Sequence, residues 1–62
     1  MSKILEIKEK IKFLTESIEE NQEVINNEGK DSPVSKVCMQ CIEEDSQMVE
    51  WLTDYVRILE NS

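Results

Sequence analysis

The sequence predicts an all-α protein, an antiparallel hairpin of two helices that dimerises into a four-helix bundle. Three observations favour this fold class. The 62 residues include one glycine and one proline and many Glu, Lys, Ile and Leu residues, a composition typical of helices. Apolar residues recur three and four positions apart in both halves of the chain. A short break of turn-forming residues separates the halves, so the two helices should lie antiparallel and side by side.

The first helix is expected from about residue 3 to residue 28. Its apolar residues alternate three and four positions apart, and they are Ile4, Ile7, Ile11, Leu14, Ile18 and Ile25. Asn21 fills the one polar slot in this row. Such spacing predicts a single apolar stripe along an α-helix. Ser2 can cap the helix, and Gly29, which opens the predicted loop 29–32, suits the left-handed position after a helix.

The second helix is expected from about residue 33 to residue 60. Ser32 is placed to cap its N-terminus, and Pro33 suits the first helical position. Its apolar side is formed by Val34, Val37, Cys38, Cys41, Ile42, Met48, Val49, Leu52, Tyr55, Val56 and Leu59, with Trp51 and Ile58 at its edge. This side covers half of the circumference or more, whereas one neighbouring helix needs a stripe of only ~100°.

The surplus of apolar surface predicts a homodimer, because a chain this short buries too little surface on its own. A second copy related by a two-fold axis is the simplest partner. The expected dimer core is Ile11, Leu14, Ile18, Cys38, Cys41, Ile42, Asp45, Met48, Val49, Leu52 and Tyr55. The whole chain should form one helical-hairpin domain, residues 1–62.

The net charge of −7 is unevenly distributed. Residues 1–12 hold four lysines and two glutamates, whereas the rest of the chain holds three basic and twelve acidic residues. This distribution disfavours binding to nucleic acid or to an acidic membrane, and it favours a basic surface on a target protein. The acidic face expected to bind such a target is Glu16, Glu19, Glu20, Glu23, Glu43 and Glu44. The alternatives are an ordinary solvated face and a metal site formed by carboxylates.

Two cysteines three residues apart, Cys38 and Cys41, raise the question of a metal or redox site. The chain has no histidine, so a zinc site would need both cysteines of a second copy. A redox pair usually lies at a helix N-terminus, whereas Cys38 lies within the predicted helix and carboxylates follow Cys41. The helical pattern favours two small apolar residues in the core, with no metal and no cofactor.

Asp45 is the unusual residue of the second helix, because it lies in the middle of the apolar side. An unpaired charge there costs stability. Asn21 is a polar residue in the corresponding row of the first helix. One hypothesis is that the two residues form a polar layer that fixes register and oligomeric state. The other is that Asp45 contacts a ligand or a target.

No apolar run approaches the ~20 residues that cross a membrane, and the charged beginning of the chain is unlike a signal peptide. We therefore expect a cytoplasmic protein with reduced thiols. The absence of alanine and the single arginine are compatible with an AT-rich bacterial or phage genome.

The string "SQMVEWL", residues 46–52, resembles the Ser-Gln-x-Leu-Asp signature of the small helical-hairpin phosphatases that act on the phospho-aspartyl response regulator of sporulation. Ser46 and Gln47 match this signature, Val49 stands for its leucine and Glu50 for its aspartate. Glu50 is one methylene longer than the aspartate, and about a dozen residues of the helix precede the motif, a longer lead than in the family. The resemblance implies phosphate removal from a response regulator.

The sequence has no histidine, no Gly-rich phosphate loop and no Ser-His or Cys-His pair. We therefore expect a non-enzymatic protein that binds and modulates or inhibits another protein, as small bacterial or phage-encoded regulators do. The alternatives are the aspartyl-phosphate phosphatase and a purely structural oligomerisation module.

Overall fold

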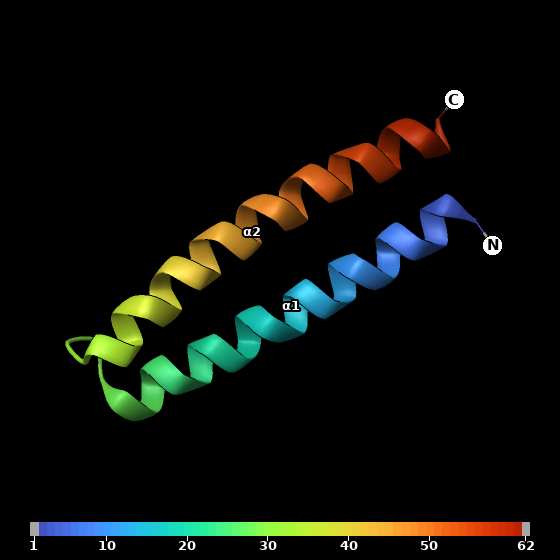
Figure 1. Cartoon of the computed structure of the whole chain (residues 1–62). Helices are drawn as coiled ribbons and strands as arrows, with labels where there is room; N and C mark the ends of the chain where they lie inside the picture. Colours follow the sequence, from blue (N-terminus) through green and yellow to red (C-terminus); the bar gives the residue numbers. More distant parts are fainter. Residues whose placement is uncertain (1, 62) are drawn as a thin grey trace.

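The computed structural model, which describes residues 2–61, contains two α-helices. Helix α1 runs Lys3–Glu28 and helix α2 runs Pro33–Glu60, the ranges expected from the spacing of apolar residues. The helices lie side by side and antiparallel, so both termini are at one end of the body (Figure 1). This body measures 46 × 17 × 12 Å. The predicted all-helical hairpin is confirmed.

The connection between the helices begins with Gly29, whose φ is 87° and ψ is 150°. The positive φ agrees with the prediction, but ψ places the residue in an extended region that is almost restricted to glycine, outside the left-handed helical region. The Gly29 N–H donates to the carbonyl oxygen of Ile25 at 2.9 Å. At the start of α2, the Ser35 N–H donates to the Ser32 hydroxyl at 3.2 Å, as expected for an N-cap. Ser2 also takes the cap position, but its side chain makes no capping hydrogen bond.

One row of side chains from each helix faces the other helix, and we call these two rows the inner seam. The inner seam consists of Ile4, Ile7, Ile11, Leu14, Ile18, Asn21 and Ile25 on α1, and of Ser35, Cys38, Ile42, Asp45, Val49, Leu52, Val56 and Leu59 on α2. Every member is buried or half-buried. The spacing of three and four residues is unbroken in both helices, as in an antiparallel two-stranded coiled coil.

The most buried apolar residues lie near the two ends of the inner seam. They are Ile7 and Val56 towards the chain termini, and Ile25 and Cys38 towards the loop. A register that pairs Ile7 with Val56 would also pair Ile25 with Cys38 and would place Asp45 level with Ile18. At the open end, Lys8 Nζ lies 3.3 Å from Glu60 Oε2. Both side chains are half-exposed, so this ion pair contributes at most about 1 kcal/mol.

Ser35 is completely inaccessible to solvent, and among residues 2–61 its hydroxyl is the one buried side-chain polar atom without a hydrogen-bond partner. We expect Ser35→Ala to raise the free energy of unfolding by about 1 kcal/mol, because an unsatisfied hydroxyl is removed and alanine favours helix. Urea denaturation measures the change. Ser46→Ala, at an exposed position of α2, reports the gain from helix propensity alone. A smaller gain in the free energy of unfolding from Ser35→Ala than from Ser46→Ala would show that the Ser35 hydroxyl stabilises the fold.

Candidate functional site

A second row of side chains runs along α2 on a side that α1 leaves open, and we call it the outer row. The outer row consists of Val34, Val37, Cys41, Glu44, Met48, Trp51, Tyr55 and Ile58. Each member precedes an inner-seam residue by one position, so the two rows are about 100° apart around the helix axis. All eight residues are exposed, and seven of them are apolar. Helix α2 therefore carries two apolar rows of equal spacing, and the hairpin covers one of them.

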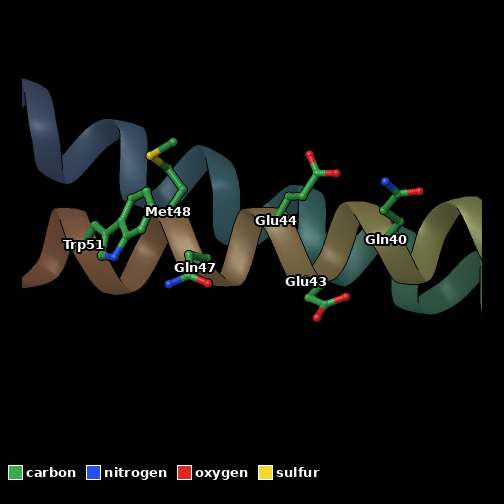
Figure 2. Close-up of a pocket in the computed structure, with 6 residues that line it drawn as sticks. All are labelled: Gln40, Glu43, Glu44, Gln47, Met48 and Trp51. Atoms are coloured by element: carbon green, nitrogen blue, oxygen red, sulfur yellow. The ribbon is translucent and has the colours of Figure 1, made fainter.

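The middle of the outer row borders an open depression of about 470 Å³. It is lined by Gln40, Glu43, Glu44, Gln47, Met48 and Trp51. All six residues belong to α2, and Met48 lies beside Trp51 (Figure 2). Small-molecule sites are usually concave enough to bury most of a ligand. A hollow formed by one helix is open on its other sides and is better suited to a side chain of a partner protein.

The predicted dimer core is divided between the two rows. Eight of its residues lie in the inner seam between the two helices of one chain, and they are Ile11, Leu14, Ile18, Cys38, Ile42, Asp45, Val49 and Leu52. The other three, Cys41, Met48 and Tyr55, lie in the outer row. The prediction did not include Val34, Val37, Trp51 and Ile58, which are also exposed there. Their unbroken spacing of three and four residues is the sequence signal that identifies them.

The six residues of the predicted acidic face, Glu16, Glu19, Glu20, Glu23, Glu43 and Glu44, are all exposed. Each α1 glutamate of this face lies three or four residues from two of the others, so neighbouring carboxylates repel each other. Within residues 2–61, the ion pairs are Lys8–Glu60 and Arg57–Asp54, and neither includes one of the six. In the part of the chain that the structure describes, no ion pair therefore compensates the repulsion between these glutamates.

The two cysteines have different environments, because Cys38 is buried in the inner seam and Cys41 is exposed in the outer row. Both are free thiols. In the described part of the chain, no cluster of three or more His, Cys, Asp or Glu side chains is arranged to hold a metal ion. Neither described helix combines the length and the apolar character needed to cross a membrane.

The string that resembles the phosphatase signature is divided between surfaces of α2. Ser46, Gln47 and Glu50 are exposed, whereas Val49 is half-buried in the inner seam. Of the exposed three, Gln47 lines the depression and the other two do not. No family model matches the chain, and no curated protein or solved structure is significantly similar to it.

Proposed function

We propose that this chain is a non-enzymatic interaction protein, an acidic homodimeric four-helix bundle that binds another protein and modulates or inhibits it. The observation that carries the proposal is the exposed outer row of α2. A row of apolar side chains with regular helical spacing is costly to expose and is typical of a surface that another protein covers. The expected location is the cytoplasm of a bacterial cell, or of the host cell if the chain is encoded by a phage.

The exposed area of the hairpin supports association with a second copy. The folded chain exposes 4951 Å², whereas a typical globular monomer of its 7.3 kDa mass exposes about 4,160 Å². The excess of about 790 Å² is close to the ~800 Å² that each partner buries in a standard protein interface. Dimerisation through one face would therefore give the chain the exposed surface of an ordinary globular protein.

The charge of the acidic face supports a target with a basic surface. Six exposed carboxylates without ion-pair partners in residues 2–61 create a negative potential that attracts lysine- and arginine-rich surfaces. Binding to such a surface relieves the repulsion between the glutamates and accelerates encounter of the two proteins. A nucleic acid or an acidic membrane would be repelled.

The exposed positions of Gln47 and Glu50 keep the aspartyl-phosphate phosphatase as the second candidate. The two side chains are three residues apart on one side of α2, where they can reach a phosphorylated protein. Release of phosphate from a phospho-aspartyl response regulator, lost in Gln47→Ala and Glu50→Ala, distinguishes this candidate from a protein that only binds. A structural oligomerisation module would form the dimer without capturing a target.

We expect reversal of Glu16, Glu19 and Glu23 to lysine to weaken target binding about tenfold, because three charge pairs at a protein surface together contribute about 1.4 kcal/mol. Affinity capture from a bacterial lysate identifies the target, and titration with the purified protein measures the change. The control is reversal of Glu6 and Glu9, towards the N-terminal end of α1, and of Asp31, in the loop, which gives the same change in net charge. Binding that is insensitive to salt would contradict an electrostatic contact.

A further inference from the structure

We infer that the second copy binds along the outer row, with α2 antiparallel to the partner's α2 and the two-fold axis level with Ser46. The inference rests on the homodimer of the proposed function, and it places Glu44 in the dimer interface, so that the target would contact the other residues of the acidic face. It identifies which surface is buried, in which orientation, and which side chains face each other. Three features of the outer row and of α1 support it.

The first feature is a gradient of side-chain size along the outer row. Val34, Val37 and Cys41 in its first half are small, whereas Trp51, Tyr55 and Ile58 in its second half are large. All six are exposed, and Trp51 and Ile58 are 60% and 65% accessible. Two such rows fit together only if the small half of one meets the large half of the other.

An antiparallel pair with its axis level with Ser46 provides this fit at every position. The facing pairs are Val34 with the partner's Ile58, Val37 with the partner's Tyr55, Cys41 with the partner's Trp51, and Glu44 with the partner's Met48. The two members of each pair are equidistant in sequence from Ser46. Each of the eight outer-row residues therefore faces a residue of the partner's outer row. A parallel pair would instead oppose Trp51 to the partner's Trp51 and Val37 to the partner's Val37, crowding one end and leaving gaps at the other.

The second feature is the position of the depression described above. Its lining residues extend from Gln40 to Trp51, so it is centred at the same level as Ser46. A two-fold axis at that level superimposes the depression of one copy on the depression of the other. The hollow beside Met48 and Trp51 would then receive the middle of the partner's outer row, including the partner's Met48 (Figure 2).

The third feature is the distribution of charge along α1. Phe13 and Val24 precede inner-seam residues by one position, which places them on the same face of the hairpin as the outer row. Phe13 is 72% exposed. The same dimer therefore brings α1 against the partner's α1, again antiparallel. Because Ser17 is level with Ser46 in the register given above, the lysine-rich segment 3–12 of one copy then lies over residues 22–31 of the partner. Those residues hold Glu23, Glu28 and Asp31 and one lysine, whereas a parallel arrangement superimposes like charges.

Glu44 is the one polar member of the outer row and lies two residues from the proposed axis. Each Glu44 is thus close to the partner's Glu44, and their repulsion weakens the dimer. This placement predicts that removing the charge of Glu44 strengthens association, although Glu44 lies in the interface. Asp45, one residue further, lies in the inner seam and should affect mainly the stability of a single hairpin.

Disulfide cross-linking tests the orientation. In Trp51→Cys, the new thiol faces the partner's Cys41, and oxidation should convert most of the dimer into a species with two interchain disulfides. In the unmodified chain, the Cys41 residues of the two copies are ten positions apart along the antiparallel pair, about 15 Å, which is too far for a disulfide. Thr53→Cys is the control, because Thr53 is exposed on the opposite side of α2. Non-reducing electrophoresis of dilute protein and mass spectrometry of the linked peptides identify the product.

Because the loss of Trp51 also removes a large interface side chain, a second variant tests the interface without weakening it. Glu44→Leu should lower the dimer dissociation constant at least tenfold, measured by analytical ultracentrifugation. Glu50→Leu adds the same side chain at an exposed position outside the outer row and should leave the constant within about twofold of the original. The fluorescence of Trp51, the single tryptophan, should shift to shorter wavelength as the concentration rises through the dissociation constant.

The possible outcomes distinguish a dimer with a different interface from the absence of a dimer. A monomer at every accessible concentration would overturn both the inference and the proposed homodimer. A dimer whose unmodified chain forms a Cys41–Cys41 disulfide, or whose Thr53→Cys variant cross-links as readily as Trp51→Cys, would overturn the arrangement and leave the homodimer standing. Tighter association of Glu44→Leu, together with a disulfide between Cys41 and the thiol introduced by Trp51→Cys, would establish the antiparallel interface.

Discussion

Replacing Asp45 by leucine is expected to raise the free energy of unfolding by about 2 kcal/mol. Asp45 is half-buried in the inner seam, where its neighbours along α2 are Ile42 and Val49. Among residues 2–61, no ion pair or hydrogen bond to its carboxylate is present. A leucine at this position buries apolar surface, a gain of about 1.5–3 kcal/mol on full burial, and removes the cost of desolvating a charge.

Urea denaturation followed by circular dichroism measures the gain, over a range of protein concentrations so that dimerisation is accounted for. Glu50→Leu, exposed on the same helix, is the control and should change the free energy by less than about 0.5 kcal/mol. Adding Asn21→Leu to both backgrounds completes a double-mutant cycle. A coupling energy above about 0.5 kcal/mol would support a polar layer of Asn21 and Asp45. A lower free energy of unfolding in Asp45→Leu would contradict the view that this carboxylate destabilises the fold.

The helix ranges could be predicted from the sequence because the signals that determine them are local. The spacing of Ile7, Ile11, Leu14 and Ile18 identifies a helix without knowledge of any neighbour. The stop at Gly29 and the cap at Ser32 depend on the conformational freedom of one residue and on one hydroxyl group. The finer geometry was less predictable. The ψ of Gly29 depends on the direction in which the chain must return, and that direction is a property of the whole hairpin.

The division of α2 into two rows could not be predicted in the same way. On a helical wheel, Cys38 and Cys41 lie on one broad apolar side, and nothing local distinguishes a residue that contacts α1 from one that contacts a second protein. The distinction depends on α1, which offers a single continuous row and so covers a single row of α2. With that partner in place, Cys38 is buried and Cys41 is exposed. The candidate interface is thus the part of the apolar surface that remains after the hairpin has formed.

An aspartate introduced in the inner seam should have a different effect from an aspartate introduced at the adjacent residue in the outer row. Val56, in the inner seam, is 6% exposed and is the most buried apolar side chain of the described chain. Val56→Asp loses the burial of valine and forces a carboxylate between the helices, a combined cost of at least about 3 kcal/mol. Because a small domain has only about 5 kcal/mol of stability, the variant should lose most of its helical circular dichroism at 25 °C.

Tyr55→Asp is the matched variant in the outer row, where the side chain is 45% exposed. It should keep the helical signal and lose the dimer in ultracentrifugation, because the carboxylate enters the proposed interface and leaves the inner seam unchanged. An unfolded Tyr55→Asp chain would show that the hairpin depends on its partner for stability, so that folding and association form one transition. A folded Val56→Asp chain would contradict the inner seam itself, since the packing of these two rows is what holds the described helices together along their length.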